Sequence, residues 1–258
     1  MNTPILDRGT GPAILLAHGT LMDHTMFKHQ VDFLSSKYRT IAYGLRAETD
    51  AAERLYSNQN LVSDCNALMD DLGIDRCVLG GLSMGGFMAI EFALQHPDRV
   101  AGLVLFDSMS VGYTDEEKYL FGQHFDPLDC EGSLSSSFID WFVPVIFSQR
   151  AMDQQPELIE DWKGRWAKRS ARSLYYEYRS WIGKPDMTPK LDQLKCPTLI
   201  LHGADDRGID PVQARNMQEN IEGAKLCLIP GCGHACTEEA PDAVNALLLE
   251  FLDGLQPW

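Results

Sequence analysis

Short runs of uninterrupted apolar residues recur along this 258-residue chain and constrain its fold more than any other feature. Six runs have the composition of strands, and they cover residues 13–18, 39–44, 77–81, 100–106, 197–203 and 225–230. Strands that expose one face alternate apolar and polar residues, whereas strands buried on both faces are apolar throughout. We therefore expect a sheet that is covered on both faces.

Helical patterns lie between these runs. Residues 58–72 carry apolar side chains at helical spacing and are followed by Gly73, a residue type that commonly ends helices. Residues 242–252 repeat the pattern, and the aspartate and proline at 210–211 are typical of the start of a helix, here one through Met217. This alternation predicts an α/β fold with a mostly parallel central sheet flanked by helices.

The alternation breaks at about residue 109 and resumes at about residue 193. The intervening residues are polar at first and then helical and rich in aromatic side chains. We predict a core formed by residues 1–108 and 193–258, with residues 109–192 inserted between two strands as a helical cap. The rings of the insertion either enclose an apolar or aromatic ligand or pack the cap onto the core, and packing is expected for more than half of them.

Composition excludes several classes of partner. The net charge is −15, with 22 basic against 37 acidic residues, so we expect no nucleic acid as a partner. The chain has no charged leader followed by an apolar core and no run of eighteen apolar residues, which predicts a cytoplasmic protein that does not associate with membranes. Seven cysteines at irregular spacing favour reduced thiols over a disulfide framework.

A single hydroxyl, that of Ser83, lies at the centre of a glycine-rich turn. Residues 81–85 read Gly-Leu-Ser-Met-Gly and lie between a predicted strand and a predicted helix, which is the context that a G-x-S-x-G nucleophile requires. A serine at such a turn takes strained dihedral angles, and glycines two positions to either side let the backbone approach closely. The alternative is a turn in which the serine only caps the helix.

An acid and a histidine follow this serine at two later strand ends. Residues 202–211 (HGADDRGIDP) follow one apolar run, and residues 230–241 (PGCGHACTEEAP) follow the next. The chain order serine, acid, histidine is the order found in α/β-hydrolases. Together with LLAHGT at 15–20 and GLSMGG at 81–86, these segments resemble the α/β-hydrolase fold family over nearly the whole chain. The resemblance implies a serine hydrolase with a helical cap.

Three aspartates are candidates for the acid. The family pattern places the acid three residues after the glycine of its loop, which selects Asp206 and leaves Asp205 as a solvated neighbour. Asp107 ends the preceding strand, where some relatives carry the acid, although the strand end also resembles a common non-catalytic one. Asp206 is the preferred candidate, and Asp205 and Asp107 remain alternatives.

His234 is the only histidine after the last predicted strand, and the resemblance implies that it is the catalytic base. Its neighbours Cys232 and Cys236 raise a metal site as an alternative. No second pair of ligands follows at zinc-like spacing, so we expect neither a metal nor an organic cofactor.

The resemblance also implies an oxyanion hole. Its two donors would be the backbone N–H groups of Thr20 and of Met84, the residue directly after the nucleophile. His18 resembles the loop histidine that supports the turn of the first donor in this family, and we expect it to have that supporting role rather than to transfer protons.

Within the family, GLSMGG, the chain length and the position of the insertion resemble the branch of 3-oxoadipate enol-lactonases and carboxylesterases. This implies hydrolysis of an ester or lactone of a small apolar or aromatic substrate through an acyl-enzyme on Ser83. Carbon–carbon bond hydrolases of vinylogous diketones are an alternative, although they usually carry a tryptophan where this chain has Ala235. A non-catalytic ligand-binding protein is another.

Four arginines lie in the insertion: Arg165, Arg169, Arg172 and Arg179. One of them could meet a substrate carboxylate, or all four could form a solvated helix face.

The start of the chain departs from the family pattern. Relatives usually open with an antiparallel pair of strands, whereas only about twelve residues precede Ala13 here. We therefore expect the first strand to be missing and the sheet edge to be short. A short edge leaves backbone groups that a second copy of the chain can cover, so a homo-oligomer is left open.

Overall fold

One seven-stranded sheet organises the protein, whose computed structural model describes residues 3–49 and 51–256. Its strands are β1 (Ile5–Arg8), β2 (Ala13–Ala17), β3 (Arg39–Tyr43), β4 (Cys77–Leu82), β5 (Val100–Phe106), β6 (Thr198–Gly203) and β7 (Lys225–Ile229). They lie in the order β1-β3-β2-β4-β5-β6-β7, in which β1 is antiparallel to β3 and every other neighbouring pair is parallel. The predicted α/β fold is confirmed.

The six predicted strands correspond to β2 through β7. Every residue of β2, β4, β5 and β6 is buried, because these central strands are covered on both faces. Strand β1 was not predicted: three of its four residues are exposed, so it lacks the apolar run that marks the others. It is the one strand before Ala13 in the described part of the chain, so a single strand stands where relatives usually have a pair.

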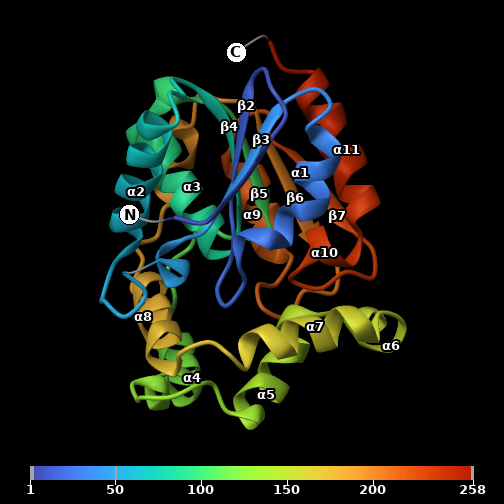
Figure 1. Ribbon diagram of the computed structural model, residues 1–258. Coiled ribbons are helices and arrows are strands. Elements are labelled where there is room, and N and C mark those ends of the chain that lie inside the picture. The colour runs from blue at the N-terminus through green and yellow to red at the C-terminus, as the bar shows by residue number, and fades with distance from the viewer. Residues whose placement is uncertain (1–2, 50, 257–258) are drawn as a thin grey trace.

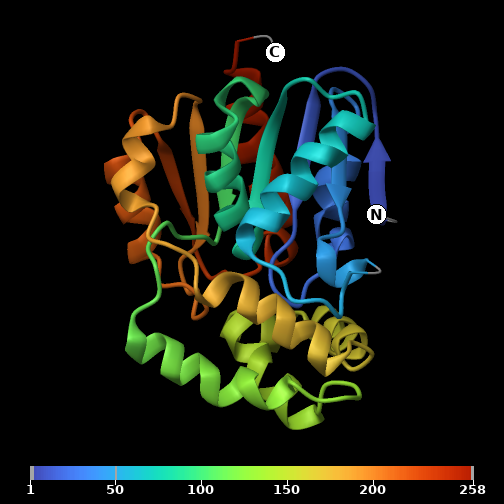
Figure 2. The same ribbon diagram turned by 90° about the vertical axis from the view of Figure 1, so that its left-hand side faces the viewer.

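Helices cover both faces of the sheet. Figures 1 and 2 show α2 (Asn58–Asp71), α3 (Met84–Gln95) and α9 (Val212–Asn220) on one face, and α1 (Lys28–Leu34) and α11 (Pro241–Asp253) on the other. The short α10 (Cys236–Glu239) precedes α11. Helix α2 ends where predicted, and Gly73 after it has a φ of +65°. Helix α9 begins at Val212, slightly later than predicted, and the Asp210 carboxylate accepts a hydrogen bond from the Val212 N–H at 2.8 Å.

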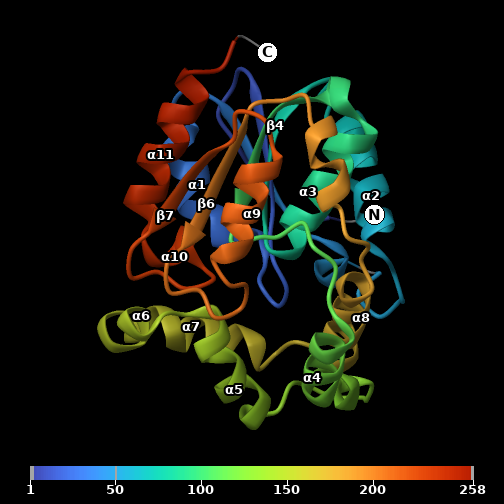
Figure 3. The same ribbon diagram turned by 180° about the vertical axis from the view of Figure 1, so that it is seen from behind.

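Residues 109–192, here called the helical segment, lie between β5 and β6. They contain α4 (Asp115–Phe125), α5 (Ser136–Ile146), α6 (Gln149–Gln154), α7 (Pro156–Trp166) and α8 (Ala171–Ile182). Four of these helices begin at a serine or threonine whose side chain accepts a hydrogen bond from the first turn: Thr114, Ser135, Ser148 and Ser170. Figures 1 and 3 show the segment beyond the carboxyl ends of the parallel strands.

The strand order brings particular loops together. Strands β2 and β4 are neighbours, as are β6 and β7. The loop after β2 therefore lies beside the loop after β4, and the loop after β6 lies beside the loop after β7. All four lie at the carboxyl edge of the sheet, where open α/β sheets bind their ligands. All seven cysteines are unpaired. Across the described residues, none of the helices has the length and apolarity needed to cross a membrane.

Candidate active site

Ser83 occupies a strained turn between β4 and α3. Its φ is +52° and its ψ is −115°, a backbone conformation that side-chain-bearing residues rarely adopt. A Cβ on Gly81 would lie 2.2 Å from the carbonyl carbon of Gly85, and a Cβ on Gly85 would lie 2.3 Å from the oxygen of Ala17. Both glycines are therefore required for this close approach, as the sequence pattern predicts.

The loops after β6 and β7 bring Asp206 and His234 into contact. The Nδ1 of His234 lies 2.8 Å from Oδ2 of Asp206, while Oδ1 of Asp206 accepts hydrogen bonds from the backbone N–H groups of Gly208 (2.7 Å) and Ile209 (3.0 Å). Because the carboxylate can only accept, Nδ1 carries the proton, and Nε2 is the free acceptor of a neutral His234 ring.

The other two candidate acids have different surroundings. Asp205 is exposed. Asp107 is fully buried, and its oxygens accept hydrogen bonds from the backbone N–H of Gly203 at 2.6 Å and of Cys236 at 3.3 Å. Asp107 therefore joins the loops after β5, β6 and β7, whereas Asp206 is the acid in contact with the imidazole.

A second histidine, His202, also contacts the carboxylate of Asp206. The sequence did not predict this contact. His202 is fully buried, with Nε2 3.0 Å from Oδ2 of Asp206 and 2.9 Å from the oxygen of Ile209. It lies four residues before Asp206 and at the end of β6. A proton on Nε2 of His202 can be donated to both acceptors, the oxygen of Ile209 and Oδ2 of Asp206. Oδ2 of Asp206 then receives hydrogen bonds from two imidazoles, those of His202 and His234.

These contacts change the pKa values of the three groups. Burial alone would raise the pKa of Asp206, but the charge of His234 and the hydrogen bonds from both imidazoles lower it to about 2. Burial lowers the pKa of His202, and the hydrogen bond to Asp206 with the charge of Asp107 overcomes this and raises it to about 9. Burial likewise opposes the charged form of His234, yet Asp206 raises its pKa overall. Asp206 is therefore ionised at neutral pH.

Ser83 and His234 line one cavity together with Thr20. Within residues 3–49 and 51–256, the Ser83 hydroxyl forms no hydrogen bond, and the backbone N–H groups of Thr20 and Met84 donate to no acceptor. A hydroxyl and two amides without partners are thus available at this edge of the sheet. Catalytic hydrogen bonds are often long in ligand-free enzymes and shorten when substrate binds.

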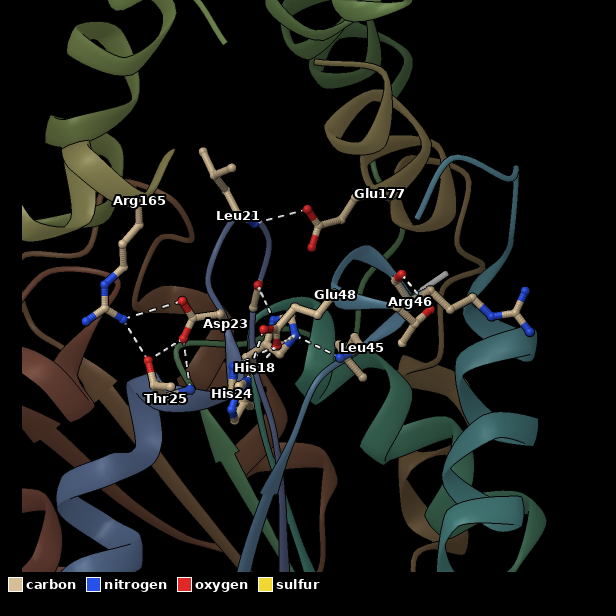
Figure 4. Close-up of polar contacts among 12 residues, drawn as sticks. His18, Leu21, Asp23, His24, Thr25, Leu45, Arg46, Glu48, Arg165 and Glu177 are labelled. Carbon is tan, nitrogen blue, oxygen red and sulfur yellow. Dashed lines mark hydrogen bonds and ion pairs between the residues drawn. The ribbon is translucent and has the colours of Figure 1, made fainter. Parts of the chain in front are cut away.

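His18 supports the loop that carries Thr20, as the resemblance implies. Its Nδ1 lies 2.9 Å from the oxygen of Gly19, and its Nε2 accepts a hydrogen bond from the N–H of Leu45 at 2.8 Å. Figure 4 shows the ring between the loop and the chain after β3. The same Nε2 lies 3.2 Å from Oε2 of Glu48. Burial lowers the pKa of His18, but the hydrogen bond to Glu48 and the charge of Glu48 raise it overall. His18 therefore joins the loop to the chain after β3.

The cavity is narrow and apolar. Six rings line it: Phe87, Tyr113, Phe121, Phe125, Phe142 and Trp181. The cavity has a volume of about 40 Å³, which is enough for a few water molecules. Other rings of the helical segment, including Phe147, Trp162 and Trp166, are fully buried outside the cavity and pack the segment internally.

The arginines of the helical segment do not line this cavity. Arg165 contacts Asp23 and Asp161, and Arg172 lies 3.6 Å from Asp129. Arg179 donates to the Tyr175 hydroxyl, and Arg169 lies 4.0 Å from Glu177. Each of these four arginines is directed to another partner, so none of them faces the cavity in this structure.

Two groups of side chains in the described part of the chain bring three metal-type ligand atoms within 4.8 Å of one another: Asp107, His202 and Asp206, and Asp23, His24 and Glu48. In the first group all four carboxylate oxygens already accept hydrogen bonds. In the second, Glu48 accepts from the ring and backbone of His24, and Asp23 from Thr25. The oxygens of both groups therefore have hydrogen-bond donors as partners. The side chains of Cys232, His234 and Cys236 do not form a third such group in the described part of the chain.

Comparison with known proteins agrees with this architecture. The model of the "Alpha/beta hydrolase family" matches residues 14–247. A curated 2-hydroxy-6-oxo-6-phenylhexa-2,4-dienoate hydrolase of Burkholderia cepacia is 28% identical, with 95% of this chain and 89% of that protein covered. Among solved structures, a thermophilic esterase from Thermogutta terrifontis is 30% identical with a TM-score of 0.91, covering 97% of this chain and 93% of the esterase.

A second solved structure is similar in fold. The enol-lactonase from Burkholderia xenovorans LB400 has a TM-score of 0.89 at 23% identity, with 97% of this chain and 96% of that chain covered. An identity this low supports the fold alone. Since the family model extends over almost all of the chain, this protein belongs to the alpha/beta hydrolase family and is a hydrolase that resembles an esterase in sequence and fold and an enol-lactonase in fold.

Proposed function

We propose that the protein hydrolyses a carboxylic ester or lactone of a small, uncharged apolar or aromatic substrate through an acyl-enzyme on Ser83. The observation that carries this proposal is the shared cavity: the Ser83 hydroxyl and the His234 ring both line it, and the same ring bonds to the Asp206 carboxylate. In the proposed reaction Ser83 is the nucleophile, His234 the base and Asp206 the group that orients the base.

The geometry supports an acyl-transfer mechanism. Asp206 holds the proton of His234 on Nδ1, which leaves Nε2 free to accept the Ser83 proton as the serine oxygen attacks the substrate carbonyl carbon. The imidazolium then returns this proton to the departing alkoxide. Water, deprotonated by the same Nε2, attacks the acyl-serine ester and releases the carboxylic acid and the free Ser83 hydroxyl.

The Thr20 and Met84 N–H groups are the proposed oxyanion donors. Both are without an acceptor in the described structure, and the Met84 amide lies at the first turn of α3, where the helix dipole favours negative charge. One such donor typically contributes about 10²- to 10³-fold in kcat. Their availability supports stabilisation of the tetrahedral intermediate without a metal or cofactor.

The cavity lining favours an uncharged substrate. The ionisable residues that line it in the described structure are His234 and Tyr113. A substrate carboxylate would find no arginine or lysine there, and a carboxylate without a cationic partner is costly to bury. The rings suit an apolar or aromatic acyl group, and the small volume suits a short one.

Carbon–carbon bond hydrolysis is the second candidate. The curated relatives of this chain include 2-hydroxy-6-oxo-6-phenylhexa-2,4-dienoate hydrolases of Burkholderia cepacia and Comamonas testosteroni, at 28% and 26% identity. The substrate in both names is a dienoate, which is a carboxylate. The absence of an arginine or lysine from the cavity lining in the described structure therefore favours the ester or lactone.

A fluorophosphonate probe tests the proposal directly. We expect a mass gain on Ser83 that is lost in Ser83→Ala and retained in Ser63→Ala, a control at an exposed serine of α2. Turnover of aryl esters, lactones and vinylogous diketones, each with and without a free carboxylate, then separates the two candidates. A folded wild-type protein that neither labels nor turns over any of them would be a ligand-binding protein, and the proposal would fail.

A further inference from the structure

The turn that carries Thr20 has an unusual residue in its third position. The Met22 N–H donates to the oxygen of Gly19 at 3.2 Å and closes a four-residue turn, called turn 19–22. Leu21 is the one residue of this turn with a positive φ, at +61°. A turn with a positive φ at its third residue alone is a type II turn, in which that position usually holds glycine. Leucine in a left-handed conformation is strained.

An unstrained alternative is available to the same four residues. A type I turn differs from type II in ψ of the second residue and φ of the third, and the change between them rotates the central peptide by roughly half a turn. For turn 19–22 this peptide joins Thr20 to Leu21. The rotation would give Leu21 a negative φ and would reverse both the Leu21 N–H and the Thr20 carbonyl.

The observed orientation has a partner in the helical segment. The Leu21 N–H donates to Oε2 of Glu177 at 3.2 Å, across 156 residues of sequence. Figure 4 shows Glu177 reaching from α8 to the tip of the turn. The side chain is fully buried, and its other oxygen, Oε1, has no hydrogen-bond partner in the described part of the chain. The nearest cation, Nη2 of Arg169, lies 4.0 Å from Oε2. The Leu21 N–H is thus a close polar contact of a buried acid, and burying an acid costs free energy unless such contacts offset it.

We propose that Glu177 is a positioning residue that keeps turn 19–22 in its type II form, so that the helical segment controls the geometry of the oxyanion donor at Thr20. This proposal rests on the proposed function for its catalytic consequence. In the type I form the Thr20 carbonyl would point toward the buried Glu177 oxygens, which repel it, and the Leu21 N–H would lose its acceptor. The acceptor on α8 therefore selects the strained turn over the relaxed one.

A second contact between the helical segment and the same loop provides a matched control. Nη1 of Arg165 donates to the Thr25 hydroxyl at 2.6 Å and lies 3.4 Å from Oδ2 of Asp23 (Figure 4). This contact also joins the segment to the loop after β2, but it does not touch turn 19–22. An Arg165→Met variant thus weakens the attachment of the segment without removing the acceptor of the Leu21 N–H.

The experiment compares three variants by two measurements. Hydrogen exchange of the Leu21 amide, followed by NMR, reports the bond itself, and the rate of fluorophosphonate labelling of Ser83 reports its consequence. Glu177→Gln keeps an acceptor and should leave both rates within about 3-fold of wild type, as should Arg165→Met. Glu177→Leu should accelerate Leu21 exchange at least about 10-fold and slow labelling and kcat by about 10- to 100-fold with little change in KM.

Each outcome decides the proposal. Unchanged Leu21 exchange or unchanged labelling in a folded Glu177→Leu protein overturns it, as does an equal loss in Arg165→Met. If Glu177→Leu does not fold, Glu177→Asp, whose carboxylate is one methylene too short, should give the same two changes. If wild-type Ser83 does not label, the proposed function fails and so does the catalytic consequence, while Leu21 exchange still decides whether Glu177 holds the turn.

Discussion

Removing the charge of His202 should make stability less dependent on pH. His202 is fully buried beside Asp206, and its pKa rises from 6.5 to about 9. Each pH unit corresponds to about 1.4 kcal/mol, so the folded protein binds this proton about 3 kcal/mol more tightly than the unfolded chain. Because the pKa is raised on folding, the stabilisation is complete below pH 6.5 and is lost as the pH rises through about 9.

The variant His202→Gln isolates this charge. A glutamine amide can donate to both acceptors of Nε2, Oδ2 of Asp206 and the oxygen of Ile209, but it binds no proton. We expect the free energy of unfolding to favour the wild type by about 3 kcal/mol more at pH 6 than at pH 10, with about 1 kcal/mol of that difference left at pH 8.

Urea denaturation followed by tryptophan fluorescence at pH 6, 8 and 10 measures this difference. His29→Gln, a change at an exposed histidine of α1, is the matched control and should show no such trend. A constant difference between wild type and His202→Gln over this range would refute the reasoning, because it would mean that His202 carries the same charge in the folded and unfolded states. The positive charge of His202 also lowers the pKa of His234, so the acid limb of kcat/KM should move to higher pH in the variant.

Three further predictions concern the same loops. Asp206→Asn should lower kcat by about 10⁴-fold, because an amide does not hold the imidazole in the required tautomer, whereas Asp205→Asn should stay within about 3-fold in the same steady-state assay. Gly208→Ala places a Cβ 3.0 Å from Cγ of His234; it should lower kcat more than KM, and equal kinetics would contradict the close contact. Burial raises the pKa of Glu239 to about 7, so its stabilisation is lost as pH rises from about 4.5 through 7; thermal melts should show a Tm that falls less over this range in Glu239→Gln than in wild type.

Local signals explain what the sequence analysis could predict. Uninterrupted apolarity located the central strands β2, β4, β5 and β6 because they are covered on both faces. The edge strand β7 has an apolar run of the same kind, although only Ile229 in it is buried. The glycines around Ser83 identified the strained turn because a Cβ at either position would overlap the backbone. Asp206 and His234 could be paired because each follows a parallel strand, and such strand ends meet at one edge.

Contacts between distant residues were not predictable in the same way. Strand β1 is short and mostly exposed, so it lacks the signal of the other strands. The bond from Leu21 to Glu177 joins residues 156 positions apart, and no spacing pattern marks either partner. His202 looked like an ordinary strand residue because its contact with Asp206 depends on how the loop after β6 folds back over the strand end.

The helical segment contacts both loops of the candidate site. The N–H of His234 donates to the oxygen of Ile146 at 2.8 Å, and Glu239 bonds to the Ser148 hydroxyl at 2.5 Å, while Glu177 holds the turn beside Thr20. A motion that lifts the segment away from the sheet breaks all three contacts at once. Any substitution that weakens the seat of the segment on the sheet should therefore lower the fraction of molecules in which both loops are held in place together.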